Sequence, residues 1–172
     1  MVCIRTIGLE NAQDVRLSNE PFAVWGRMIP SLCEGRWSYR TEIFEIAQEM
    51  CFPDEAYDAA EDGAIFIGAY EGKACVGLAV LRKDRFRYLY LDDLKVCREY
   101  RRKGVGGMLV KACFKKAEEL GFHGVSVTCQ DNNLSAALFY IKQGFEIGGF
   151  DNRGYRGTSQ ENKADIYFYK DI

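Results

Sequence analysis

The sequence predicts a single α/β domain built on a central mixed sheet of six or seven twisted strands with helices on both faces. Apolar runs of strand length and amphipathic segments of helical length follow one another along the chain. The 172 residues, 48% of them apolar, are enough for one sizeable core. No repeat, low-complexity tract or linker interrupts residues 1–172, so we expect no second domain.

The first half of the chain is predicted to hold, in order, a strand at 2–8, helices at 19–32 and 40–50, and strands at 64–70 and 74–83. Asn19 can cap the first helix and Pro21 fits its first position, while apolar residues recur behind them at helical spacing. The two later strands flank the turn sequence EGK, which predicts a β-hairpin.

The second half is predicted to hold a strand at 87–97, a helix at 103–120, a strand at 124–130, a helix at 134–143, and strands at 145–150 and 164–170. The first helix has a continuous apolar face and ends at Gly121. In the strand before it, Asp92 and Asp93 stand side by side. Adjacent strand residues point to opposite faces, so at most one of these carboxylates is expected to face a ligand.

Composition excludes several classes of protein. A net charge of −2 argues against nucleic-acid binding, which requires clustered basic residues. No apolar run approaches the roughly 20 residues of a membrane span, and the first ten residues lack the pattern of a signal peptide. We therefore expect a cytoplasmic protein with no membrane partner.

Cysteine and histidine usage argues against a metal centre. The seven cysteines are widely spaced without a C-x-x-C motif, so neither a disulfide framework nor a zinc site is predicted, and most of these thiols are expected to be reduced and buried. His123 is the only histidine, which leaves little material for a His-ligated metal or a Ser/His triad.

The segment at the start of the helix predicted at 103–120 has the chemistry of an anion site. Three basic residues and three glycines gather there: Arg101, Arg102, Lys103, Gly104, Gly106 and Gly107. Glycines let backbone N–H groups approach a ligand closely, and the N-terminus of the helix adds partial positive charge. A phosphorylated ligand is therefore expected.

Two nucleotide-binding motifs do not fit this segment. A Walker A loop needs Gly-Lys followed by Ser or Thr, which the residues after Gly104 do not provide. A dinucleotide fingerprint needs a third glycine where the chain has Leu109. The pattern that remains is R-x-x-G-x-G.

This pattern resembles the pyrophosphate loop of the GNAT superfamily of N-acetyltransferases, which bind acetyl-coenzyme A. The resemblance runs from residue 88 to residue 150. It includes the pattern N-x-x-A-x-x-x-Y-x-x-x-G-F, filled here by Asn133, Ala136, Tyr140, Gly144 and Phe145. Within the superfamily the chain is similar to the streptothricin acetyltransferases, also in the early segment 19–39.

The resemblance implies acetyl-coenzyme A as cosubstrate, with no metal. The diphosphate would lie on the loop amides, and the pantetheine arm would pair with the strand backbone at 94–96. Arg102 stands where many relatives have glycine, and Asn133 is also a candidate helix cap. The residues assigned to the cofactor in this way are Leu94, Lys95, Val96, Arg101, Arg102, Lys103, Gly104, Val105, Gly106, Gly107, Asn133, Ala136 and Tyr140.

For catalysis, the resemblance makes Tyr140 the general acid that protonates the departing thiolate. The alternative is that this tyrosine only packs beside the apolar stripe of its helix. Asp92 and Asp93 are both candidates for the base that takes a proton from the acceptor amine. Cys97 and Cys129 could suggest an acetyl-cysteine intermediate, but direct attack by the amine is favoured because the chain has one histidine.

The resemblance predicts transfer of acetyl to the β-lysine part of streptothricin. Acetylation of a protein N-terminus or another small amine is an alternative, because residues 132–149 also resemble the ribosomal-protein alanine acetyltransferases. A module that binds acetyl-coenzyme A without turnover is a third. An acidic run at 54–62 is either a solvated surface or a collector of cationic substrate through Asp54, Glu55 and Asp58. Relatives often dimerise through their last strands, so a homodimer is one option.

Overall fold

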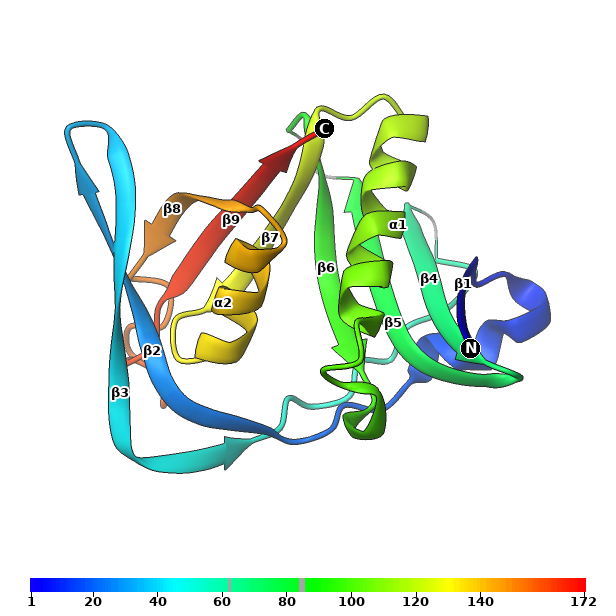
Figure 1. Ribbon diagram of the computed structural model, residues 1–172, viewed down its shortest axis with the longest axis horizontal. Helices are drawn as coiled ribbons and strands as arrows, with labels where there is room; N and C mark the ends of the chain where they lie inside the picture. Colours follow the sequence, from blue (N-terminus) through cyan, green and yellow to red (C-terminus); the bar gives the residue numbers. More distant parts are fainter. Residues whose placement is uncertain (62, 84–85) are drawn as a thin grey trace. The chain divides into compact units, whose positions relative to one another are not determined.

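The computed structural model describes residues 1–61, 63–83 and 86–172 (Figure 1). Seven strands belong to one mixed sheet, which confirms the predicted fold class. The contacts within the chain define two compact units, which are described in turn. The first unit comprises Met1–Glu20, Cys51–Val125 and Asp171–Ile172, and the second comprises Pro21–Met50 and Ser126–Lys170.

The first unit contributes four antiparallel strands to the sheet. In spatial order they are β1 (Val2–Thr6), β4 (Ala64–Glu71), β5 (Ala74–Lys83) and β6 (Tyr88–Val96). The predicted hairpin is confirmed, since β4 and β5 pair along their length on either side of a short turn. All four strands lie where the sequence predicted them.

Helical elements cover both faces of this four-stranded part. Helix α1 (Val105–Glu119) lies over one face (Figure 1), and it approaches closely at Gly77, where an added Cβ would come within 3.1 Å of the Leu109 side chain. The 3-10 helix η1 (Leu9–Arg16) buries Val15 on the opposite face. There it joins a cluster, called the η1 cluster below, that contains Ile7, Val15, Tyr57, Phe66, Tyr70, Leu78 and Val80.

Strand β6 contains a β-bulge at its two aspartates. Val80 of β5 pairs with Asp93, whereas the next residue, Leu81, pairs with Leu91, so Asp92 is the extra residue. Paired residues point to the same side of a sheet, and Asp93 therefore lies on the face of Val80 and the η1 cluster. The bulge explains why two adjacent carboxylates interrupt an otherwise regular alternation.

The second unit holds a long hairpin and the remaining strands. The hairpin joins β2 (Phe22–Cys33) to β3 (Arg36–Met50) through Glu34 and Gly35, both of which have positive φ. Strands β7 (Gly124–Gln130), β9 (Asp165–Asp171) and β8 (Glu146–Asp151) are neighbours in that order. Helix α2 (Leu134–Lys142) follows β7 and buries Leu134, Ala137 and Tyr140.

The helices predicted at 19–32 and 40–50 were wrong, because both segments are strands of this hairpin. In β2 the buried residues alternate at Val24, Gly26, Met28 and Pro30, which is the period of a strand. Pro30 inside the predicted helix was a contrary signal, since proline breaks a helix interior. The long-range pairing between the two segments overrides the helical spacing of their apolar residues.

The cysteines are more exposed than predicted. Cys113 and Cys129 are buried, Cys75 and Cys97 are half-buried, and three others, Cys3, Cys33 and Cys51, are exposed. The expectation failed because the segments around Cys33 and Cys51 were assigned to helices and their flanks, whereas Cys33 ends β2 and Cys51 directly follows β3. None of the helices described is long and apolar enough to cross a membrane.

Candidate active site

The glycine loop takes the conformation that an anion site requires. After β6 the chain forms a short 3-10 turn, η2 (Arg98–Tyr100), and then passes through Arg102 and Gly104 with φ of 64° and 85°. Gly104 makes no side-chain cap for α1, and the first helical bond runs from Met108 N to Gly104 O at 3.1 Å. The amides of residues 105–107 precede this ladder and can donate to a ligand.

The three basic residues of the loop differ in their surroundings. The guanidinium of Arg101 donates to the carbonyls of Val96 (3.0 Å) and Glu20 (3.1 Å), so it holds the end of β6 and the segment before β2. The Lys103 ammonium lies 5.4 Å from the centre of the Tyr100 ring. Arg102 is exposed. Arg101 thus has a structural role besides the charge predicted for it.

Asp92 is held in an ion-pair network at the bulge of β6. Its Oδ2 lies 2.6 Å from Nε of Arg82, and the same guanidinium lies 2.5 Å from Glu61 Oε1. The two carboxylates raise the pKa of Arg82, with the hydrogen bond to Glu61 as the larger cause. Asp92 is therefore a surface carboxylate neutralised by a permanent cation.

Asp93 has different partners on the other side of the bulge. Its Oδ2 lies 2.9 Å from the ammonium of Lys95 and accepts a long hydrogen bond, 3.4 Å, from the hydroxyl of Tyr57. Lys95 is 9% exposed although it carries a charge. The side chain of Lys95 thus forms an ion pair with Asp93. Leu94, Lys95 and Val96 are the last residues of β6 and form the strand segment that was predicted to pair with pantetheine.

Tyr57 was not among the predicted site residues. The only aromatic residue in the acidic run, it is 7% exposed, and its pKa is raised chiefly by burial and further by Asp93. A lone aromatic residue among acids and alanines was the signal that could have identified it, since such a residue seeks a core. Tyr57 fastens a segment without regular structure to the η1 cluster.

The predicted substrate-binding acids are partly engaged in local structure. Asp54 accepts a hydrogen bond from the backbone of Asn19, and Asp58 accepts one from the backbone of Ala60 at 2.9 Å. Glu55 is exposed. Asp62, the last acid of the predicted run, lies outside the described residues.

In the second unit, Asn133 is the N-cap of α2, which is one of the two roles predicted for it. Its side-chain oxygen accepts from the backbone N–H of Ala136 at 3.2 Å, which satisfies one of the donors left open at a helix start. Cofactor contact by Asn133 would add to this capping bond. The backbone of Ala136 is accordingly the donor of that cap.

Tyr140 lies in an aromatic group within the second unit. It is 7% exposed, and its ring contacts those of Phe139, Phe145 and Phe168 at centroid distances of 5.4, 5.6 and 5.8 Å. The ring thus has the packing role given as the alternative. A phenylalanine would keep all three ring contacts, so the hydroxyl can be tested separately.

A polar cluster beside β7 was not predicted. The hydroxyl of Tyr155 donates to Asp165 (2.9 Å) and accepts from Gln130 (3.0 Å), and Arg27 lies 3.7 Å from Asp131. Burial raises the pKa of both aspartates and raises that of Tyr155 to about 12. The five residues come from three separate segments of the chain, around residues 27, 130 and 155–165, which share no motif.

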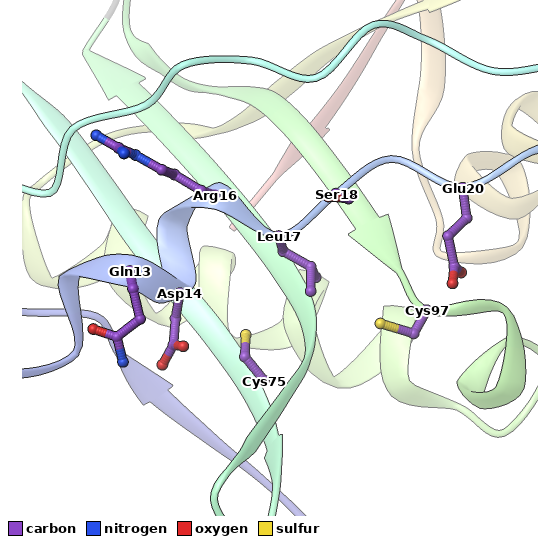
Figure 2. A pocket seen from close by; sticks show the side chains of 8 residues that line it. All are labelled: Gln13, Asp14, Arg16, Leu17, Ser18, Glu20, Cys75 and Cys97. Carbon is purple, nitrogen blue, oxygen red and sulfur yellow. The ribbon is translucent and has the colours of Figure 1, made fainter.

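A shallow cavity of about 380 Å³ lies beside η1 in the first unit (Figure 2). Its lining comes from the segment 13–20, with the thiols of Cys75 and Cys97 opposite. The carboxylates of Asp14 and Glu20 stand on its wall, and Glu20 accepts from the backbone N–H of Arg98. The two carboxylates outnumber the one cation of the lining, Arg16, which disfavours a phosphate here, so the cofactor assignment stays with the glycine loop. Within the described ranges, no group of three His, Cys, Asp or Glu side chains could hold a metal ion.

Comparison with known proteins places these features in a family. Residues 29–145 match the model of the acetyltransferase (GNAT) family. Streptothricin acetyltransferase A of Bacillus subtilis (strain 168) is 34% identical over 162 residues, which cover 92% of this chain and 94% of that protein.

Two solved structures share the fold over the whole chain. One is a provisionally named streptothricin acetyltransferase from Bacillus anthracis str. Ames in complex with acetyl coenzyme A, with a TM-score of 0.91, 28% identity and all of both chains covered. The other is nourseothricin acetyltransferase, with a TM-score of 0.81 and 21% identity, covering 99% of this chain and 98% of that one. The glycine loop, the seven-stranded mixed sheet and these matches lead to one conclusion: the chain belongs to the GNAT family of acetyltransferases and is of the streptothricin acetyltransferase type.

Proposed function

We propose that this protein transfers acetyl from acetyl-coenzyme A to a primary amine on the β-lysine part of streptothricin. The observation that carries the proposal is the start of α1, where backbone amides stand open behind a left-handed glycine. The streptothricin acetyltransferases among the relatives supply the substrate class, and the acetyl-coenzyme A in the Bacillus anthracis structure supplies the cosubstrate.

The residues of the loop fit the proposed cosubstrate. The amides of Val105, Gly106 and Gly107 can donate to diphosphate oxygens, and an added Cβ at Gly104 would meet open space, as expected where a ligand approaches the backbone. Arg102 and Lys103 add positive charge. Bound acetyl-coenzyme A would supply an activated acetyl thioester.

Each proposed catalytic residue moves a proton. The acceptor is an ammonium at neutral pH, because the ordinary pKa of an alkyl amine is near ~10.4, and a carboxylate of β6, Asp92 or Asp93, takes its proton. The free amine then attacks the thioester directly. Tyr140 donates a proton to the leaving thiolate and recovers one from the new amide nitrogen, so the net reaction releases one proton to solvent.

The acidic run has a proposed role in collecting substrate. Streptothricin carries several amines, and Asp54, Glu55 and Asp58 place negative charge on the first unit. Exchange of all three for their amides should raise the KM for streptothricin at low salt and leave the affinity for acetyl-coenzyme A unchanged. An unchanged KM at low salt would show that these acids are only a solvated surface.

The test of the function is a panel of amines assayed for release of coenzyme A. Streptothricin, an aminoglycoside, a polyamine and an alanine-initiated peptide represent the competing acceptors. We expect turnover with streptothricin at the highest kcat/KM. Preference for the peptide would support protein N-terminal acetylation instead, and cofactor binding without turnover on any amine would indicate a binding module.

A further inference from the structure

Tyr57 joins the acidic run to the bulge of β6. The residues around it, 51–58, have no regular secondary structure, and its side chain is the part of this segment that enters the η1 cluster. The ring packs edge-on against Phe66 with centroids 5.7 Å apart. The hydroxyl reaches past this packing to Asp93 Oδ2. The side chain therefore connects the acidic run, which is proposed to collect substrate, with a candidate base.

Two cationic side chains lie near the ring of Tyr57. The Lys95 ammonium lies 5.7 Å and the Arg82 guanidinium 6.0 Å from its centroid. Lys95 also contacts Asp93 Oδ2 directly. The hydroxyl of Tyr57 and the ammonium of Lys95 thus converge on a single oxygen of Asp93. The other oxygen, Oδ1, makes no hydrogen bond or ion pair with the rest of the described chain.

Asp92 and Asp93 differ in the groups that hold them. Asp92 is bound by a guanidinium, which keeps its own protons at all relevant pH values and is fixed by a second carboxylate, Glu61. Asp93 is held through Oδ2 by the neutral hydroxyl of Tyr57, at a long 3.4 Å, and by the ammonium of Lys95 at 2.9 Å. Of the two, Asp93 has the surroundings of a base.

We propose that Asp93 is the base of the proposed acetyl transfer and that Tyr57 is its positioning residue. This inference rests on the proposed function. Tyr57 and Lys95 hold Oδ2, so that Oδ1 faces the ammonium of the acceptor and takes its proton, which then passes to solvent. The hydrogen bond from Tyr57 is long, at 3.4 Å, and hydrogen bonds of catalytic groups often shorten when substrate binds. The raised pKa of Tyr57 keeps its hydroxyl protonated as a donor.

A double-mutant cycle on kcat tests this coupling. Asp93→Asn should lower kcat by about 100-fold, the contribution typical of a general base. Tyr57→Phe, which keeps the ring and removes the hydroxyl, should lower kcat by about fivefold and move the acid limb of the kcat/KM profile to higher pH. If Tyr57 acts through Asp93, the double variant should be no slower than Asp93→Asn alone.

Tyr70→Phe is the matched control. Tyr70 belongs to the same η1 cluster and also donates to a carboxylate, Asp14, at 2.7 Å, but it does not contact β6 aspartates. This variant should lose thermal stability like Tyr57→Phe and keep the kcat and pH profile of the wild type. The two tyrosines thus separate loss of packing from loss of positioning.

Three outcomes would overturn the inference. A double variant about fivefold slower than Asp93→Asn would show that Tyr57 acts independently of Asp93. A large loss in Asp92→Asn together with a near-normal Asp93→Asn would move the base to Asp92. Both results leave acetyl transfer itself intact. A wild-type protein that turns over no amine in the panel would refute the proposed function, and the inference with it.

Discussion

Helices α1 and α2 begin in different ways. Helix α1 follows β6 through Gly104, which is left-handed and provides no side-chain cap, whereas α2 follows β7 through Asn133, whose side chain accepts from Ala136. Neither helix has an acidic residue in its first turn. The open donors of α2 are thus partly satisfied by its own cap, while those of α1 are left for something else to satisfy.

The difference indicates that the two helices have different roles. An uncapped helix start costs stability, and a protein retains it where a ligand completes the hydrogen bonding. The start of α2 has an internal cap, and α2 carries a buried tyrosine whose hydroxyl is proposed for chemistry. Under this view, changes at the start of α1 alter binding, and changes in α2 alter turnover or stability.

The largest expected effect comes from Gly104→Asp. Aspartate tolerates the left-handed conformation, and open space surrounds the position of the added Cβ. Its carboxylate would occupy the open amides and repel diphosphate, so the Kd for acetyl-coenzyme A should rise by about 100-fold in isothermal titration calorimetry.

Gly121→Asp is the matched control for that variant. Gly121 ends the same helix, has φ of 74° and likewise has open space around an added Cβ. It should carry similar backbone strain without a change in Kd. Equal effects of the two variants on Kd would contradict the assignment of the ligand to the start of α1.

Tyr140→Phe should have the next largest effect, on kcat alone. Removing a general acid typically costs ~10²–10⁴-fold, but a thiol with an ordinary pKa near ~8.5 is already a fair leaving group, so a loss of roughly tenfold to a hundredfold is expected. The Kd for acetyl-coenzyme A should be unchanged, because the ring contacts with the three phenylalanines are kept. A kcat and pH profile equal to those of the wild type would assign Tyr140 to packing.

Asn133→Ala should remove the cap of α2. The free energy of unfolding, measured by urea denaturation, should fall by about 1 kcal/mol. Asn133→Asp retains an acceptor for the Ala136 amide and should restore most of that loss. If aspartate is as destabilising as alanine, the capping bond is not what stabilises the helix start.

The smallest effect is expected at Arg102, whose positive φ strains an L-residue. Arg102→Gly and Arg102→Ala both remove the charge and should weaken acetyl-coenzyme A binding by about threefold at low salt. Only glycine relieves the strain, so the free energy of unfolding in urea should be about 1 kcal/mol higher for Arg102→Gly than for Arg102→Ala. If alanine and glycine unfold at the same urea concentration, the conformation at residue 102 is not strained.

The structural features that could be predicted from the sequence are those that depend on residues close together in the chain. Three features each depend on residues that lie within a few positions of one another: the helix start at Gly104, the cap at Asn133 and the β4–β5 hairpin. The β2–β3 hairpin was not predicted, because its apolar residues fit both periods and the pairing partner is remote. The contacts of Arg101 with Glu20 and of Tyr57 with Asp93 span 81 and 36 positions, and no local pattern reports such distances.

Because the seven thiols differ in burial, thiol labelling can measure how often this protein unfolds. Cys3, Cys33 and Cys51 are open to a maleimide, whereas burial raises the pKa of Cys113 and Cys129 to about 12, which keeps these two unreactive. Mass spectrometry after a short labelling pulse would therefore resolve native from opened molecules by adduct number. Cys113 lies in α1 and Cys129 in β7, so each buried thiol reports on a different unit. Storage without a reducing agent would conversely link chains through the exposed thiols, one of which, Cys33, lies at the exposed end of β2.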